Sequence, residues 1–180
     1  ETFGKIFNEG TDFQRDASQF DRLFKDGETY AIGNLKATAL HTPGHTPACM
    51  VHVIGKSAFV GDTIFMPDSG TARADFPGGS AQALYQSAQK ILNLAPDTKL
   101  YLCHDYGAEG REVNYQTTVA EQQLHNVHLG NNATEDQFVA LREKRDSGLG
   151  IPRLMIPAIQ VNMRAGHFPP AQDNAAVYLK

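Results

Sequence analysis

The sequence has few cysteines, no long apolar run and no excess of positive charge, and each absence excludes a class of protein. Cys49 and Cys103 are the only cysteines among 180 residues. Two cysteines this far apart do not make a disulfide framework or a local metal knuckle, so we expect a reducing, cytoplasmic compartment. No apolar run approaches the ~18 residues that a membrane span requires, and the first residues lack the pattern of a signal peptide. We therefore expect no membrane partner.

The charge balance argues against nucleic-acid binding. The chain has 20 acidic and 16 basic residues and a formal net charge of -4, which gives no field suited to a phosphate backbone. Its 16 glycines and 9 prolines are about 14% of the chain, well below the roughly 25% typical of disorder. The sequence contains no repeat, low-complexity tract or linker, so we expect one domain over residues 1–180.

The first half of the chain has the pattern of antiparallel strands. Short segments rich in β-branched and aromatic residues predict strands over 28–32, 35–42, 48–54 and 57–61. Gly33-Asn34 and Gly55-Lys56 stand where tight hairpin turns would join them. The apolar spacing within 12–25, followed by Gly27, favours a helix.

The second half mixes helices with a buried strand. Apolar residues spaced as on a helix lie between Ser80 and Pro96, and residues 100–103 predict a strand. Thr118 with Glu121 and Thr134 with Gln137 have the spacing of a capping box, so each pair predicts the start of a helix. The charged run 142–146 is typical of a solvated helix face. The fold class is therefore α/β or α+β.

Three potential metal ligands come directly after predicted strands. His45 lies in TPGHT, Asp62 in VGDT and His104 in LCHD. A glycine directly before His45 and before Asp62 lets the backbone turn so that these side chains point back over the end of the sheet. Imidazole and carboxylate ligands suit zinc, iron or manganese. Each motif alone is a weak signal, but the three together predict a metal site.

The remaining histidines and cysteines have simpler interpretations. His41 is expected to be a hydrogen-bonded structural residue, and His52 is expected to face the solvated side of its strand. His125 and His128 are three apart on a predicted helix with no third ligand nearby in sequence, so we expect both on the surface. We expect neither Cys49 nor Cys103 to be a nucleophile.

The order of these motifs resembles a known family. TPGHT, then AFVGDT, then LYLCHDY resemble the later metal motifs of the metallo-β-lactamase superfamily, whose αββα sandwich carries its metals at one edge. The stretches GTARADFPGGSAQALYQS, HDYG and IPRLMIPAIQVNMRAG resemble the persulfide dioxygenase (sulfur dioxygenase) branch, and especially its bacterial β-lactamase-hydrolase-like subgroup. The resemblance covers almost the whole chain.

The resemblance implies a metal and two of its ligands. In this branch one Fe(II) is held by two histidines and an aspartate, so His45 and Asp62 would be metal ligands, with zinc as the alternative metal. The other imidazole comes in the family from an upstream HxHxDH motif, and no histidine precedes His41 here. We therefore expect the chain to be the C-terminal portion of the fold, truncated at its N-terminus.

The resemblance also implies further site residues. His104 matches a histidine that ligates a second metal in dinuclear relatives and lies beyond the iron in persulfide dioxygenases, so it is a candidate metal ligand. We expect His104 and Tyr106 to be catalytic residues. Arg73 and Tyr106 match positions that resemble glutathione contacts, since a guanidinium holds a carboxylate and a phenol donates a hydrogen bond. Asp75 is expected to orient the Arg73 loop. Ala74 stands where the subgroup often has cysteine.

The leading hypothesis is a non-haem iron persulfide dioxygenase that oxidises glutathione persulfide to sulfite and glutathione. One alternative is a dinuclear hydrolase of glutathione thioesters, like glyoxalase II, with His104 as a ligand. A β-lactam hydrolase is disfavoured because the local motifs match the glutathione-handling branch. An inactive fragment or a non-catalytic domain is a further alternative. The open sheet edge, together with the resemblance, predicts a homodimer.

Overall fold

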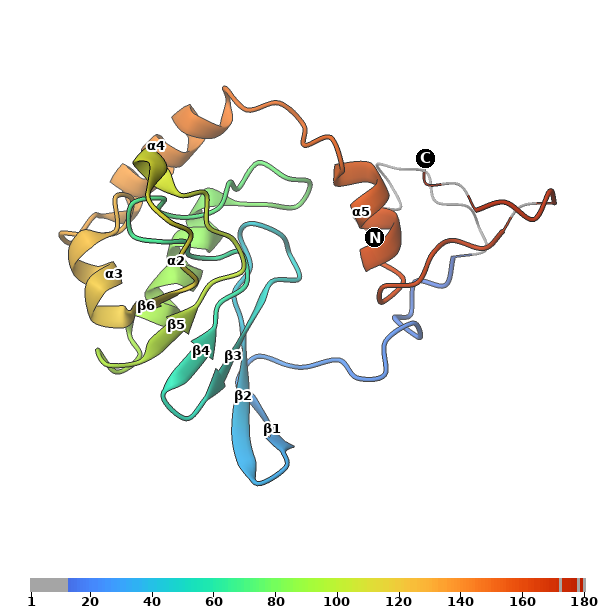
Figure 1. The fold of residues 1–180 in the computed structure, drawn as a ribbon, viewed down its shortest axis with the longest axis horizontal. Helices are drawn as coiled ribbons and strands as arrows, with labels where there is room; N and C mark the ends of the chain where they lie inside the picture. The colour runs from blue at the N-terminus through green and yellow to red at the C-terminus, as the bar shows by residue number, and fades with distance from the viewer. Residues whose placement is uncertain (1–12, 172, 178, 180) are drawn as a thin grey trace. The chain divides into compact units, whose positions relative to one another are not determined.

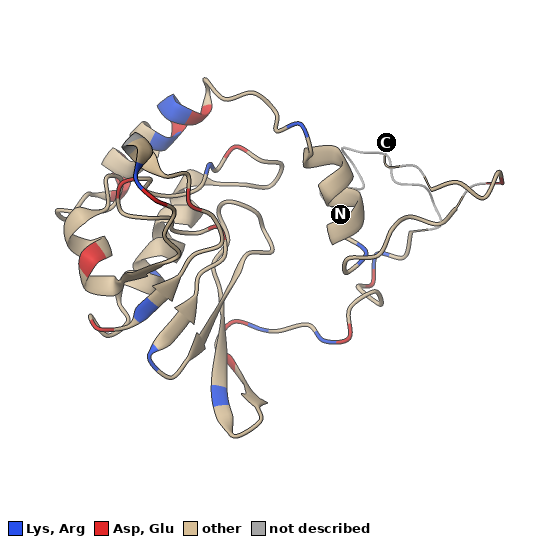
Figure 2. Ribbon diagram, viewed as in Figure 1, with Lys and Arg blue, Asp and Glu red and all other residues tan. Residues whose placement is uncertain are grey.

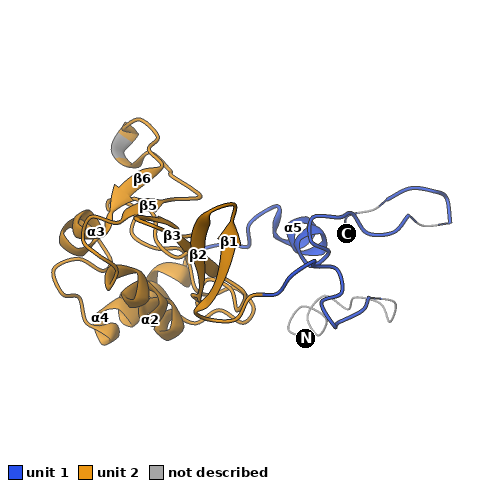
Figure 3. Cartoon of the chain, turned by 90° about the horizontal axis from the view of Figure 1, so that it is seen from below, with its two compact units in different colours: residues 1–23, 149–180 blue, residues 24–148 orange. Residues whose placement is uncertain are grey.

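The computed structural model describes residues 13–171, 173–177 and 179, which fall in two compact units. Residues 24–148 form one unit, and residues 1–23 together with 149–180 form the other (Figure 3). All of the site residues expected from the sequence belong to the unit 24–148. Among the helices that the structure describes, none is long and apolar enough to cross a membrane.

The unit 24–148 is built on a six-stranded sheet whose strands follow the order of the sequence (Figure 1). The strands are β1 (Glu28–Ile32), β2 (Leu35–His41), β3 (Met50–Ile54), β4 (Ser57–Phe59), β5 (Lys99–Tyr101) and β6 (Gln116–Thr118). All neighbours are antiparallel except β4 and β5, which are parallel. The two predicted hairpins are confirmed, while three of the predicted strands end earlier because their last residues turn into the loops of the site.

One face of the sheet packs against helices. Val51, Ala58 and Leu100 from β3, β4 and β5 are fully buried against α2 (Ala81–Leu92), which presents Leu84 and Ile91. The helices α3 (Val119–His125) and α4 (Glu135–Asp146) contact α2. This is the mixed α/β arrangement expected from the sequence, with helices on a sheet and a core between them.

Side-chain caps start the helices at the predicted positions. Ser80 accepts a hydrogen bond from the backbone N–H of Ala83 at the start of α2. Thr118 and Thr134 form complete capping boxes with Glu121 and Gln137 at the starts of α3 and α4. These contacts satisfy backbone N–H groups that have no partner within the helix, which explains why local sequence signals located all three starts.

The charged run at the end of α4 is not a solvated face, contrary to our expectation. Basic and acidic residues follow one another along this helix (Figure 2), but Arg142 is only 1% exposed and Asp146 only 4%. Together with Phe138 they stand four residues apart, so all three lie on one face of the helix. That face is buried, and only the residues between them are solvated.

Three other elements differ from expectation. Residues 13–25 form turns and bends without a helix; Phe20 and Leu23 of this segment are exposed, so no apolar face is buried to stabilise one. The strand β6 and, in the other unit, the helix α5 (Met155–Asn162) were not anticipated. β6 is only three residues long and α5 contains Pro157, so neither has a strong local pattern.

A candidate metal centre at the ends of three strands

The three predicted metal ligands lie together at one edge of the sheet. His45 follows β2, Asp62 follows β4 and His104 follows β5, and these strands run in the same direction. The Nε2 atom of His45 is 3.9 Å from Oδ2 of Asp62, and Nε2 of His104 is 3.3 Å from Oδ1 of the same carboxylate. The two imidazoles therefore face different oxygens of one carboxylate.

His45 is held in a defined orientation. Its Nδ1 is 2.7 Å from the carbonyl oxygen of Arg73, and because a carbonyl only accepts, Nδ1 carries the proton. The ring packs against Phe76 at a centroid distance of 4.8 Å, and the side chain is 13% exposed. Nε2 keeps its lone pair on the side of Asp62. A metal-binding histidine is commonly fixed in this way, by a hydrogen bond from its other nitrogen.

Asp62 has an unsatisfied buried oxygen. Within the part of the chain that the structure describes, its Oδ1 is buried and has no hydrogen-bond partner. Such an atom costs about 1–3 kcal/mol, and a bound cation would remove that cost. His45 and Asp62 thus fit a metal ion chemically. However, among residues 13–171, 173–177 and 179, no group of three or more histidine, cysteine or acidic side chains is arranged to hold one by itself.

Gly44 allows the His45 loop to lie against α2. Its φ is +140°, and a Cβ built on it would lie 2.3 Å from the Cα atom and the backbone nitrogen of Leu84. The Gly44 carbonyl accepts a hydrogen bond of 2.9 Å from the backbone N–H of Ser80, just before α2 begins. Gly61, before Asp62, also has a positive φ, of +54°. Both glycines therefore provide the turns that we expected from the sequence.

Replacing Gly44 by alanine should destabilise the protein and displace His45. The methyl group cannot fit beside the backbone of Leu84, and the backbone conformation is unfavourable for any other residue. We expect a loss of at least about 2 kcal/mol in the free energy of unfolding, measured by urea denaturation. Gly55→Ala is a suitable control because it also has a positive φ but nothing within 4 Å of its added Cβ. Equal losses in the two variants would show that the close approach to Leu84 is unimportant.

His104 is more exposed than His45 and is supported mainly by its neighbours. Its side chain is 55% exposed and its ring stacks with Tyr106 at a centroid distance of 6.3 Å. Tyr106 is itself 71% exposed. Between them, the buried side chain of Asp105 accepts hydrogen bonds from Arg111 and from the backbone N–H of Asn114, and these hold the pKa of Asp105 far below its usual value. Asp105 thereby anchors the loop that carries both rings.

Arg73 is engaged by its neighbour in the sequence. Its Nε and Nη2 donate to the two carboxylate oxygens of Asp75, which raises the pKa of Arg73 and lowers that of Asp75. The guanidinium also lies 5.0 Å from the ring centre of Phe76, the ring that packs on His45. Asp75 therefore orients Arg73, as expected. An anionic substrate that bound Arg73 would compete with this ion pair.

The segment that precedes Arg73 is held by His128, which is distant in the sequence, and the sequence did not reveal this contact. His128 is only 6% exposed, so our placement of it on the surface is wrong, whereas His125 is exposed as expected. The backbone N–H of Thr71 donates to His128 Nδ1 over 2.9 Å. A Cβ on Gly70 would overlap the His128 ring at 2.1 Å. The only sequence signal was Asn126, whose side chain accepts from the His128 N–H and turns the chain inward.

The buried His128 makes stability depend on pH. Burial, reinforced by Arg142 and Arg145, lowers the pKa of His128 to about 4, from 6.5 in its unperturbed state. Between these pH values the unfolded chain binds a proton that the folded chain does not, so stability falls as the pH drops from 6.5 towards 4. We expect a loss of up to about 3 kcal/mol, measured by urea denaturation at several pH values. His128→Asn should flatten this dependence, and His125→Asn should not; equal slopes in all three proteins would contradict the assignment.

The other candidate groups have structural partners. His41 Nε2 is 2.8 Å from the carbonyl oxygen of Pro47, so its structural role is confirmed. His52 is not on a fully solvated side: it is half-buried, its Nδ1 is 2.8 Å from the Tyr30 hydroxyl, and burial lowers its pKa. Cys49 Sγ is 3.0 Å from the Thr46 hydroxyl, and Cys103 is exposed beyond the end of β5.

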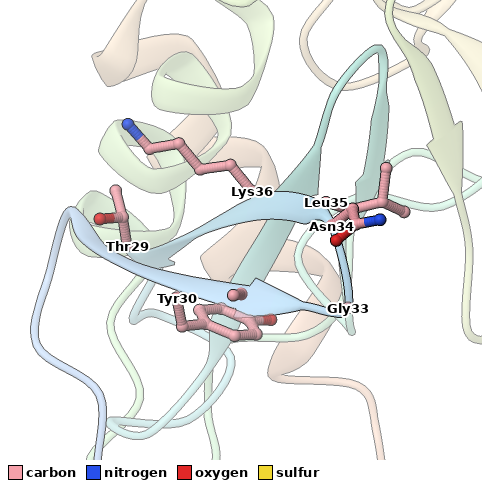
Figure 4. Close-up of a pocket in the computed structure, with 7 residues that line it drawn as sticks. Thr29, Tyr30, Gly33, Asn34, Leu35 and Lys36 are labelled. Atoms are coloured by element: carbon pink, nitrogen blue, oxygen red, sulfur yellow. The ribbon is translucent and has the colours of Figure 1, made fainter.

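A shallow pocket of about 340 Å³ is lined by the β1–β2 hairpin, away from the metal ligands (Figure 4).

Comparison with known proteins gives the family. Residues 2–104 match the Metallo-beta-lactamase superfamily. The chain is 54% identical over its whole length to a probable metallo-hydrolase of Burkholderia pseudomallei, covering 65% of that protein. It is 50% identical to glyoxylase B2 of Dictyostelium discoideum, over 99% of this chain and 62% of that one. It is 33% identical to the human mitochondrial persulfide dioxygenase ETHE1, over 83% of this chain and 56% of that one.

A solved structure agrees with these relatives. The crystal structure of ETHE1 from Myxococcus xanthus superimposes with a TM-score of 0.71 at 29% identity, over 80% of this chain and 60% of that one. The chain thus spans 56–65% of the length of the three relatives above. The motifs TPGHT and VGDT, with His45 and Asp62, lie within the matched residues. The chain therefore belongs to the metallo-β-lactamase superfamily and has its mixed α/β fold.

Proposed function

We propose that this chain is part of a metal-dependent dioxygenase that oxidises glutathione persulfide. The observation that carries the proposal is the pairing of His45, fixed through Nδ1, with Asp62, whose buried Oδ1 has no hydrogen-bond partner among the described residues. His45 and Asp62 would hold Fe(II), with zinc as the alternative metal. When bound, Fe(II) supplies open positions for O2 and for a substrate sulfur. The similarity to the persulfide dioxygenase ETHE1 supports the substrate class.

The two histidines support a single metal ion. The His45 side chain is 13% exposed, and its Nδ1 is held by a carbonyl oxygen. The His104 side chain is 55% exposed, and its ring stacks with the exposed ring of Tyr106. A metal-binding histidine usually has its second ring nitrogen, the one that does not bind the metal, fixed by a hydrogen bond. His45 meets this condition through Nδ1, so we expect it to be the stronger metal ligand of the two. His104 would instead lie beside the metal, with its Nε2 3.3 Å from Oδ1 of Asp62.

The remaining residues would bind and orient the thiol. The hydroxyl of Tyr106, on an exposed ring beside His104, can donate a hydrogen bond to a sulfur or a peptide carbonyl of the substrate. Arg73 can bind a glutathione carboxylate if that group replaces Asp75. In the overall reaction the persulfide, O2 and water give glutathione, sulfite and two protons. The terminal sulfur is oxidised, O2 is reduced, and the third sulfite oxygen comes from water.

A glutathione thioester hydrolase with two metal ions is the second candidate. It is favoured by the position of His104, whose Nε2 lies 3.3 Å from the Asp62 oxygen that His45 does not face. A carboxylate placed between two imidazoles can be shared by two ions. The identity of 50% to glyoxylase B2 supports this class of reaction. A non-catalytic domain remains the third outcome of the test.

Metal content and two activity assays separate these functions. They require the intact protein that contains this chain. One iron per chain and O2 uptake with glutathione persulfide would support the dioxygenase. Two zinc ions per chain and cleavage of a glutathione thioester would support the hydrolase. A protein that binds no metal and has neither activity would support a non-catalytic domain.

A further inference from the structure

We propose that the buried Arg142–Asp146 ion pair of α4 is a positioning device for His45, and that it acts through the segment 71–75. The inference rests on the proposed function, because it assumes that His45 is a metal ligand. It concerns residues that lie outside the metal motifs and belong to a helix far from them in sequence. Hydrogen bonds link α4 to the segment 71–75, and that segment to the His45 ring.

The ion pair holds the backbone of the segment 71–75 on both sides of Arg73. Arg142 Nη1 donates to the carbonyl oxygen of Thr71 over 2.9 Å, and Asp146 Oδ2 accepts from the backbone N–H of Ala74 over 2.8 Å. Arg142 is bound to the other oxygen of Asp146, Oδ1, through Nε at 3.2 Å and Nη2 at 2.8 Å. One charged pair therefore fixes the Thr71–Ala72 peptide group and the Arg73–Ala74 peptide group, and the latter contains the Arg73 carbonyl.

The residue fixed in this way contacts the metal ligand directly. The carbonyl oxygen of Arg73 accepts the Nδ1–H of His45 at 2.7 Å. The position of that carbonyl determines which ring nitrogen carries the proton and how the ring is turned, so that Nε2 faces Asp62 at 3.9 Å. His128 binds the backbone N–H of Thr71 and supports the same segment from a second direction.

Stability alone does not account for an ion pair at this place. The side chains of Arg142 and Asp146 are 2% and 5% exposed, so both charges are almost fully removed from water. A buried ion pair is often no more stabilising than an apolar pair of similar size. What an apolar pair cannot supply is directed hydrogen bonds to the Thr71 carbonyl and the Ala74 N–H. We infer that these bonds are the function of the pair.

The test replaces both charges at once so that neither is left alone. In the double variant Arg142→Met with Asp146→Leu, no charge is buried and the fold should be kept. In the metal-free chain, NMR of the ring nitrogens of His45 should show the Nδ1–H tautomer in the wild type and a mixture of tautomers in the variant. The affinity for Zn(II), measured by competition with a chromophoric chelator, should fall about tenfold. A single unchanged tautomer together with unchanged affinity would overturn the proposal.

Controls separate positioning from folding and from the proposed function. Glu143→Ala, on the exposed face of α4, should change neither readout. Arg142→Lys keeps a positive charge beside Asp146 but cannot also reach Thr71 with a planar fork. It should produce a smaller change in the same direction, and it decides the matter if the double variant does not fold. If His45→Ala binds Zn(II) as the wild type does, the proposed metal centre fails, while the His45 tautomer still tests the positioning.

Discussion

Asp62→Asn should abolish metal binding and leave the metal-free protein at least as stable as the wild type. The substitution keeps the size of the side chain and removes the charge that a cation requires. It also removes a carboxylate whose buried Oδ1 has no hydrogen bond within the described residues. We expect metal affinity to fall at least a hundredfold, since a ligand is lost outright. The free energy of unfolding without metal should rise by up to about 1 kcal/mol.

Metal titration and urea denaturation in the presence of a chelator measure the two effects separately. Asp97→Asn is the control, because Asp97 is an exposed carboxylate paired with Lys56 and lies away from the site. It should leave metal affinity unchanged. A variant Asp62→Asn that binds metal normally would exclude Asp62 as a ligand. A large loss of stability in the metal-free variant would mean that Asp62 has a structural role instead.

Asp146→Ala should cost about 3–5 kcal/mol in the free energy of unfolding, a large loss for a single substitution. It leaves the guanidinium of Arg142 without its charge partner, and the Arg142 side chain is only 2% exposed. It also removes the acceptor of the Ala74 N–H. Urea denaturation at neutral pH measures the loss.

The matched comparisons for this prediction are another ion pair and the double variant. Asp97→Ala breaks the exposed pair with Lys56 and should have no measurable effect, because exposed pairs contribute little. The double variant Arg142→Met with Asp146→Leu should recover most of the stability that Asp146→Ala loses. A double variant as unstable as the single one would show that the hydrogen bonds to the segment 71–75, and not the unpaired charge, carry the loss.

The parts of the fold that the sequence predicted are those with local causes. Gly33-Asn34 and Gly55-Lys56 specify hairpins through their own backbone preferences, and the capping boxes of Thr118 and Thr134 bond within four residues. Both kinds of signal are complete within a short stretch of chain. The same holds for the loops of His45 and Asp62, each turned by the glycine before it.

The parts that the sequence did not predict depend on contacts between distant residues. Arg142 and Asp146 are charged, and their burial depends on hydrogen bonds to the segment 71–75, about seventy residues earlier. His128 is buried for the same reason, through Thr71. The segment 13–25 has apolar residues at helical spacing, but spacing alone does not stabilise a short helix without a surface to pack on.

The proposed function requires His45 and Asp62 to bind a common metal ion. An anomalous-difference map from crystals of the intact protein grown with iron or zinc tests it most directly. We predict a peak within roughly 2.0–2.2 Å of both His45 Nε2 and the Asp62 carboxylate. A second peak beside His104 would favour the two-metal hydrolase. Metal bound elsewhere, with these two side chains making no contact to it, would contradict the claim.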